Sequence, residues 1–159
     1  MTTKRTVEEW GRLAAGKRGV VAGEAYAVAM RIFIGHAKGH AEDAHVAHVA
    51  AEIQARVPGA VPVLSRDEWQ RSFALSGSWD AWVRDVGAGC DWQGCPTFDG
   101  YVVMTEQIGR ATAQIVSYAL AAGRDVLYWP RGAHAPVPVR AIEAVPGEDS
   151  WLCGWRIIP

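Results

Sequence analysis

The stretch TFDGYVVMTEQIGRATAQIVSYALAAGRDVLYW, residues Thr97 to Trp129, decides the fold class of this chain. It contains the apolar strand YVVM, a helix-periodic segment from Ile108 to Ala122 and a second apolar strand, DVLYW. Gly123 occupies the place where a left-handed residue commonly ends a helix. Strand, helix and strand in this order predict a parallel strand pair joined by a right-handed crossover.

The same alternation precedes this stretch. RIFIG, residues 31–35, and VPVL, residues 61–64, are short apolar strands, and EDAHVAHVAAEIQARV between them has the apolar spacing of a helix. The sequence Ser65-Arg66-Asp67-Glu68 has capping-box spacing and predicts a helical turn through Phe73. Ser78 is expected to cap a further helix over Trp79 to Val86, and residues 87–96 are expected to form a loop.

The two ends of the chain differ from this pattern. Thr6 opens a capping box, so a short helix is expected to end near Gly16, with a loop over residues 17–23. The C-terminal segments VPVRAIEAV and WLCGWRII predict an antiparallel hairpin that extends one edge of the sheet. We therefore expect residues 1–30 to form an N-terminal helix and lead-in. Residues 31–159 are expected to form a single-domain, Rossmann-like, three-layer α/β fold with a mostly parallel sheet and a C-terminal antiparallel hairpin.

Composition excludes several classes of function. Sixteen Lys and Arg against seventeen Asp and Glu give a net charge of −1, so a nucleic-acid partner is not expected. The apolar runs are too short or too charged to span a membrane, and no secretory signal core is visible, so we expect a cytoplasmic protein. Three cysteines, at positions 90, 95 and 153, favour neither a disulfide framework nor a zinc site over ordinary thiols.

Ligands of open parallel sheets bind beyond the carboxyl ends of the strands, and this rule selects the candidate site residues. They are Gly35, His36, Lys38 and His40 after the first strand, Ser65 and Arg66 after the second, Thr105 and Glu106 after the third, and Trp129 and Arg131 after the fourth. Asp99 precedes its strand, so it is expected at the opposite end of the sheet as a turn or cap residue.

The loop GHAKGH, residues 35–40, has glycines for close backbone approach and a lysine, which suits a phosphate at a helix start. The alternative is an ordinary glycine-containing turn with a solvated lysine. His45 and His48 lie one helical turn apart, and solvated surface histidines are favoured over a metal site. Neither a metal nor a cofactor is expected.

Taken together, the strand RIFIGH, the strand FDGYVVM and the run IVSYALAAGRDVLYW resemble the nucleoside 2-deoxyribosyltransferase-like family, which is distantly similar to TIR-type domains. The resemblance covers Arg31 to Trp129. It implies a nucleoside or nucleotide ligand, chemistry at the N-glycosidic bond, and a homo-oligomer with its sites at subunit contacts. Members of the family use a helix Glu as nucleophile and a second carboxylate after the preceding strand.

This chain departs from that pattern at the nucleophile. The matching helix segment reads Ala113-Gln114-Ile115, and no Asp or Glu occurs from Gln107 to Arg124. Glu106 matches the second carboxylate. The resemblance therefore implies that Glu106 acts as acid or electrostatic stabiliser, with Gln114 orienting the sugar or water, although a solvated loop Glu is the alternative.

Three hypotheses follow. The first is an enzyme that hydrolyses or transfers at an N-glycosidic bond. The second is a non-catalytic module that binds or sequesters a nucleotide. The third is a protein-interaction module in which the Trp-rich segment from Trp69 to Trp92 and the C-terminal hairpin contact a partner, because Trp is favoured at interface centres.

Overall fold

The computed structural model describes residues 6–16, 18–21, 24–27, 30–36, 43–91, 93–94, 97–149 and 151–159. Its centre is a five-stranded sheet with the strand order β4-β3-β5-β7-β8. The first four of these strands run parallel, and β8 pairs antiparallel at the edge. The strands are β3 (Arg31–Gly35), β4 (Val61–Leu64), β5 (Gly100–Val103), β7 (Asp125–Tyr128) and β8 (Val137–Pro138).

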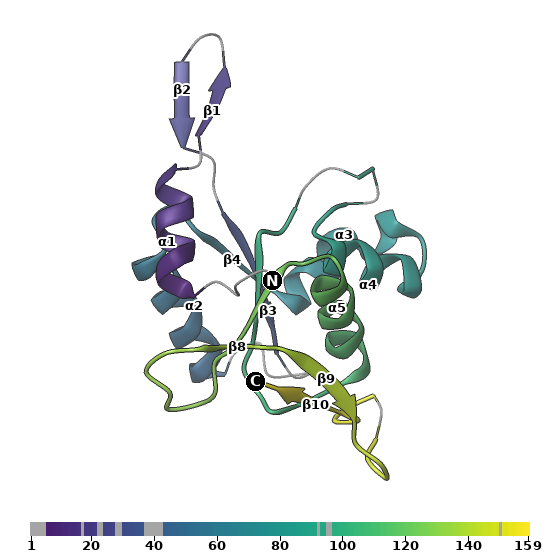
Figure 1. Ribbon diagram of the computed structural model, residues 1–159. Coiled ribbons are helices and arrows are strands. Elements are labelled where there is room, and N and C mark those ends of the chain that lie inside the picture. Colours follow the sequence, from purple (N-terminus) through teal and green to yellow (C-terminus); the bar gives the residue numbers. More distant parts are fainter. Residues whose placement is uncertain are drawn as a thin grey trace.

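Helices cover both faces of this sheet, which confirms the expected three-layer α/β fold. Figure 1 shows α1 and α2 on one side of the sheet and α3, α4 and α5 on the other. The helices are α1 (Val7–Gly16), α2 (Ala44–Arg56), α3 (Ser65–Ser76), α4 (Trp79–Ala88) and α5 (Arg110–Ala121).

The alternation of side chains along the strands creates two apolar clusters, one under each helix layer. Ile32 and Ile34 of β3 pack in the cluster that includes Trp10 of α1 and Val49 of α2. Phe33, between them, packs in the cluster with Trp82 of α4 and Ile115 of α5. Each cluster is therefore built by one set of alternate strand residues.

Several local predictions are confirmed. The strands at residues 31–35 and 61–64 have the predicted bounds. The Thr6 Oγ1 accepts from the Glu9 N–H at 3.3 Å, and the helix that follows ends at Gly16. Ser78 caps α4, with its Oγ accepting from the Ala81 N–H at 3.1 Å. Gly123 has φ of 72°, as expected after the end of α5.

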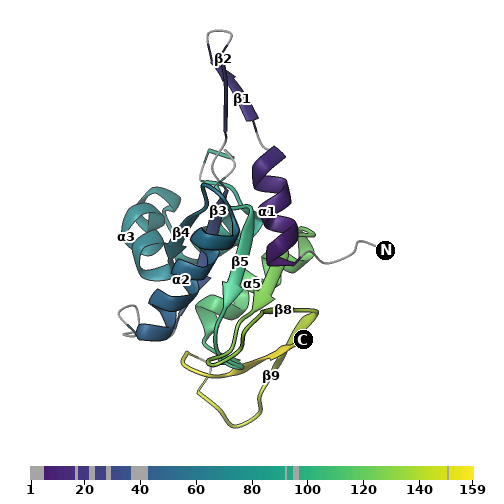
Figure 2. The same cartoon turned by 90° about the vertical axis from the view of Figure 1, so that its left-hand side faces the viewer.

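Two local predictions are wrong. The proposed capping box at Ser65 does not form, because the N-cap of α3 is Leu64, which makes no side-chain capping bond. The loop expected over residues 17–23 instead contains β1 (Arg18–Val21), which pairs antiparallel with β2 (Glu24–Ala27). Figures 1 and 2 show this hairpin extending away from the three layers.

The C-terminal hairpin forms but does not extend the main sheet. Strands β9 (Ala141–Ala144) and β10 (Trp155–Ile158) pair antiparallel, and β10 also pairs with β6 (Gln107–Ile108) in a separate three-stranded sheet. One edge of the main sheet is β8 instead, and the other is β4. Ile157 of β10 is 2 % exposed and packs in the cluster under α5.

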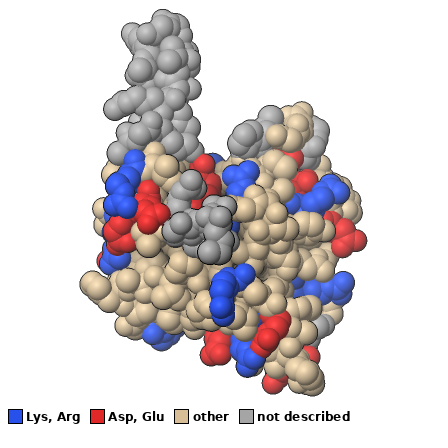
Figure 3. Space-filling model, viewed as in Figure 1, with Lys and Arg blue, Asp and Glu red and all other residues tan. Residues whose placement is uncertain are grey.

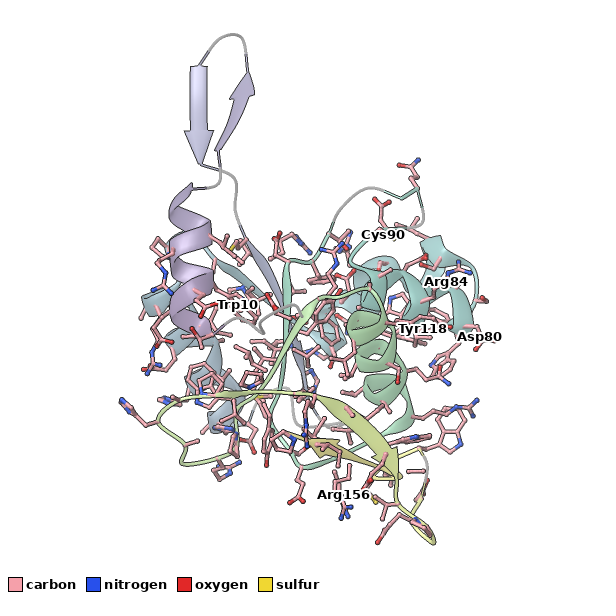
Figure 4. The ribbon with its side chains drawn as sticks, viewed as in Figure 1. Trp10, Asp80, Arg84, Cys90, Tyr118 and Arg156 are labelled. Atoms are coloured by element: carbon pink, nitrogen blue, oxygen red, sulfur yellow. The ribbon has the colours of Figure 1, made fainter. Side chains whose placement is uncertain are left out.

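The N-terminal helix belongs to the same core as the sheet. Figure 4 shows Trp10 pointing from α1 toward the sheet. Its side chain is fully buried, and its indole N–H donates to the Asp125 carboxylate at 3.2 Å. Gly100 of β5 lies directly beneath, where an added Cβ would come within 2.6 Å of the Trp10 ring. Helix α1 therefore fills part of the core on one face of the sheet.

The face of the molecule drawn in Figure 3 shows no dominant charge among its described residues. Figure 3 shows basic and acidic side chains interspersed over the described residues of one face, in keeping with the net charge of −1. Within the described ranges, no helix has the length and apolar character needed to cross a membrane.

Candidate functional site

The candidate site is a small hollow at the carboxyl ends of the parallel strands. The chain passes from β3 to β4 on one side and then returns to β5 on the other, so the strand order reverses between β3 and β5. Such a switch point is where ligands bind in open α/β sheets. The hollow encloses about 50 Å³ and is lined by His36, Asp43, His45, Val46, Met104, Thr105 and Arg131. We call it the switch-point hollow.

Asp43 and Arg131 form the charged part of the switch-point hollow. The Asp43 carboxylate caps α2 by accepting from the His45 N–H at 2.8 Å. The same oxygen accepts from the Arg131 guanidinium, also at 2.8 Å. The Arg131 side chain is 70 % exposed, so this pair is accessible to a ligand and contributes little to stability by itself.

Each of the two histidines makes a hydrogen bond to a backbone group. The His45 Nε2 lies 3.0 Å from the Trp129 carbonyl oxygen, which can only accept, so His45 donates through Nε2. The His36 Nε2 accepts from the Arg66 backbone N–H at 3.2 Å. The hollow thus combines a carboxylate, a guanidinium and two imidazoles with assigned roles.

Glu106 lies next to the hollow but does not line it. Thr105 lines the hollow and donates through its hydroxyl to the Gln107 carbonyl oxygen at 2.8 Å. Glu106 is exposed, and its carbonyl oxygen accepts from the Ile157 N–H at 2.8 Å. Burial, together with the Glu106 carboxylate, raises the pKa of the Tyr128 phenol. The negative charge of Glu106 therefore disfavours ionisation of Tyr128, which lies at the end of β7.

The structure does not bring Gln114 into the switch-point hollow. The buried residues of α5 are Ala113, Ile115, Val116 and Ala119. Gln114 is half-buried, and Tyr118, one turn further on, is 41 % exposed. The α5 side chain that meets the end of β3 is Thr112, whose methyl would lie 3.1 Å from a Cβ added at Gly35.

Gly35 and the side chains of Ser65, Arg66 and Trp129 do not line the switch-point hollow, although they were predicted site residues. Gly35 is the buried last residue of β3, and Ser65 is the half-buried first residue of α3. Arg66 is exposed and contributes its backbone N–H to His36. The Trp129 ring is fully buried, so Trp129 serves the hollow only through its carbonyl group. Lys38 and His40 lie outside the described residues.

Sequence reasoning missed Asp43, Met104 and the role of His45. An Asp directly before a helix-periodic segment is a recognisable N-cap signal, so Asp43 could have been found. His45 was expected to be a solvated surface histidine, but it is half-buried and lines the hollow, whereas His48 beside it is exposed. The rotation of α2 about its own axis determines that His45, and not His48, faces the hollow.

Other polar and aromatic clusters lie away from the hollow. Glu68 of α3 is 2 % exposed and accepts from Arg71 at 2.6 Å and from the Ser72 hydroxyl at 2.9 Å. The Trp82 indole N–H donates to the same hydroxyl at 2.9 Å. These bonds satisfy a buried carboxylate and therefore indicate a structural role.

Aromatic side chains also gather at the surface near the start of α5. The Arg110 guanidinium lies 5.2 Å from the centre of the Trp79 ring and 4.8 Å from that of Trp151. Trp151 and Leu152 are 60 % and 61 % exposed. Binding of a protein partner by this cluster stays a prediction.

The residues that the structure describes include no group of three or more His, Cys, Asp or Glu side chains arranged to hold a metal ion. Comparisons with protein families, with curated proteins and with solved structures found no match to this chain. The class that the fold defines is therefore an α/β protein with a mostly parallel sheet and a polar hollow at its switch point.

Proposed function

We propose that this protein binds a nucleoside or nucleotide, with its sugar or phosphate in the switch-point hollow. The observation that carries the proposal is the convergence of His36, Asp43, Thr105 and Arg131 on one hollow at the carboxyl ends of the strands. Asp43 can accept from a sugar hydroxyl, and Arg131 can donate to a phosphate. A nucleotide contains both of these partners, the sugar hydroxyls and the phosphate.

The test is ligand-induced stabilisation. We expect at least one member of a panel of nucleosides and nucleotides to raise the melting temperature by mass action. Arg131→Ala should weaken that binding roughly ten- to hundredfold, the scale of one hydrogen bond to a charged group. Arg140→Ala is the matched control, because Arg140 is exposed and does not line the hollow. A melting temperature that no panel member changes would contradict the proposal.

Cleavage at the N-glycosidic bond is a second proposal. It is supported by the exposed carboxylate of Glu106, one residue after Thr105 of the hollow. Mass spectrometry of the ligand before and after incubation should then detect free base, and Glu106→Gln should abolish its release. Unchanged ligand, bound but intact, would leave nucleotide binding as the function.

A further inference from the structure

A second hollow borders the switch-point hollow along α2. It is a groove of about 400 Å³, which we call the α2–β4 groove. Figure 2 shows α2 beside β4 at this edge of the sheet. Val46 lines both hollows. The groove is lined by Val46, Ala47, Ala50 and Gln54 of α2 and by Ala60, Val61, Pro62 and Leu64 at the sheet edge.

The two hollows differ in size and chemistry. The switch-point hollow, at about 50 Å³, is well below the range of small-molecule sites, roughly 300–1,000 Å³. It is therefore too small for a whole nucleotide and suits one part of it, the sugar or the phosphate. The α2–β4 groove falls within the range of small-molecule sites, roughly 300–1,000 Å³. The side chains that line it within the described part of the chain are aliphatic, apart from the Gln54 amide.

An added β-strand is a poor occupant of this groove. The Val61 N–H donates inward to the Met30 carbonyl oxygen at 2.8 Å, so the next residue, Pro62, faces the outer edge of β4. Proline has no N–H, and its presence at an outer edge removes a donor that a pairing strand requires. The groove therefore suits an occupant that needs no backbone pairing.

A nucleobase is also a poor occupant. Proteins commonly hold bases by stacking them on aromatic rings and by hydrogen bonds to their polar edges. Among the described residues, no aromatic side chain lines the α2–β4 groove, and Gln54 is the only polar side chain of its lining that could reach a base edge. An aliphatic chain matches the lining, because burial of methylene groups requires no polar partner.

We infer that the two hollows form one site for an amphiphilic nucleotide, whose sugar or phosphate lies in the switch-point hollow and whose aliphatic chain lies in the α2–β4 groove. The inference rests on the proposed function and specifies its ligand class. Val46 is the shared wall at which the polar head and the chain meet.

The experiment compares AMP with its butyl, hexyl and octyl phosphate esters by calorimetry, at concentrations below those at which the esters aggregate. Affinity should rise roughly two- to fourfold for each added methylene group that the groove buries. Ala47→Phe should fill the groove and remove this gain while leaving AMP binding unchanged. Ala55→Phe is the control, because Ala55 is exposed on the same helix but does not line the groove.

Three results would overturn the inference. The first is an octyl ester that binds no more tightly than AMP. The second is an affinity that still rises with the length of the ester chain in Ala47→Phe. In both cases, AMP binding that depends on Arg131 would leave the proposed function intact. The third is a dimer that Ala47→Phe, but not Ala55→Phe, converts to a monomer, because a second copy would then cover the groove.

A failure of the proposed function gives a different pattern. If neither AMP nor its esters bind, octyl phosphate without a nucleoside tests the groove alone. Binding of octyl phosphate that Ala47→Phe abolishes would retain the aliphatic site and reject the nucleotide. No binding of octyl phosphate would overturn the inference as well.

Discussion

At the residue scale, the tyrosine of the central strand shows how a polar group is held inside the core. The Tyr101 side chain is fully buried, and its hydroxyl lies 2.5 Å from the Val86 carbonyl oxygen and 3.0 Å from that of Gly87. Burial raises the pKa of the Tyr101 phenol. Strand β5 is thereby attached to the C-terminal end of α4 by a polar contact as well as by apolar packing.

This raised pKa predicts a loss of stability at alkaline pH. Below the ordinary tyrosine pKa of about 10, both the folded and the unfolded chain keep the proton, and the stabilisation is complete. As the pH rises above that value, the unfolded chain releases the proton first, so the free energy of unfolding falls. Tyr101→Phe should reduce this alkaline loss and lower the free energy of unfolding by about 1–2 kcal/mol at neutral pH.

Urea denaturation across the neutral to alkaline range provides the measurement. Tyr118→Phe is the matched control, because the Tyr118 side chain is 41 % exposed, and its loss should leave the neutral stability unchanged. Part of the alkaline loss should persist in Tyr101→Phe, since burial and Glu106 also raise the pKa of Tyr128. An unchanged alkaline profile would show that Tyr101 does not contribute.

At the element scale, the contact between α4 and α5 depends on a glycine inside a helix. A Cβ added at Gly87 would lie 2.5 Å from the Tyr118 Cβ and 2.6 Å from the Ile115 carbonyl oxygen. Both of these atoms are fixed to the backbone of α5, so rotation of a side chain cannot relieve the contact. The absence of a side chain at Gly87 therefore sets how closely the two helices approach.

We predict that Gly87→Ala destabilises the protein. In an exposed helix this change would stabilise by about 1 kcal/mol through helix propensity. Here the overpacking cost, about 3 kcal/mol at the upper end of its usual range, should exceed that gain and leave a net loss of about 2 kcal/mol. Urea denaturation monitored by circular dichroism measures it, with Arg84→Ala, an exposed change in the same helix, as the control. A more stable Gly87→Ala would show that α4 and α5 can separate without loss.

At the scale of the whole molecule, α1 links the beginning of the chain to the centre of the sheet. Val7, Trp10 and Ala14 belong to the same buried cluster as Ile32 of β3 and Leu127 of β7. The hydrogen bond from the Trp10 indole to Asp125 spans 115 residues of sequence. The folded domain therefore includes the N-terminal helix.

Trp10→Ala tests this arrangement. Removal of a fully buried Trp should lower the free energy of unfolding by about 3–5 kcal/mol, and the whole fold should respond in one transition. Leu13→Ala is the control, because Leu13 lies on the same helix but is 39 % exposed, and it should cost about 1 kcal/mol or less. If Trp10→Ala melted α1 alone and left the unfolding of the sheet unchanged, α1 would be a separate lead-in.

Local pattern in the sequence determined most of the elements. The apolar runs at residues 31–35 and 61–64 predicted two strands at their observed bounds, because short continuous apolar runs are typical of strands in parallel sheets. The helix starts at Thr6 and Ser78 were predicted because a side-chain oxygen satisfies free backbone N–H groups there. The position of Asp99 was predicted by strand direction alone, and its carboxylate accepts from the Arg31 N–H at the amino end of the sheet.

Only the tertiary structure decided which side chains meet. Asp43 and His45 join Thr105 and Arg131 because α2 packs across the switch point, and nothing in the helical repeat itself shows which turn faces that point. The pairing of β6 with β10 joins Ile108 to Trp155, and local patterns do not specify partners so far apart in sequence. Secondary structure depends on neighbouring residues, whereas a binding site depends on the rotation and docking of whole elements around a shared core.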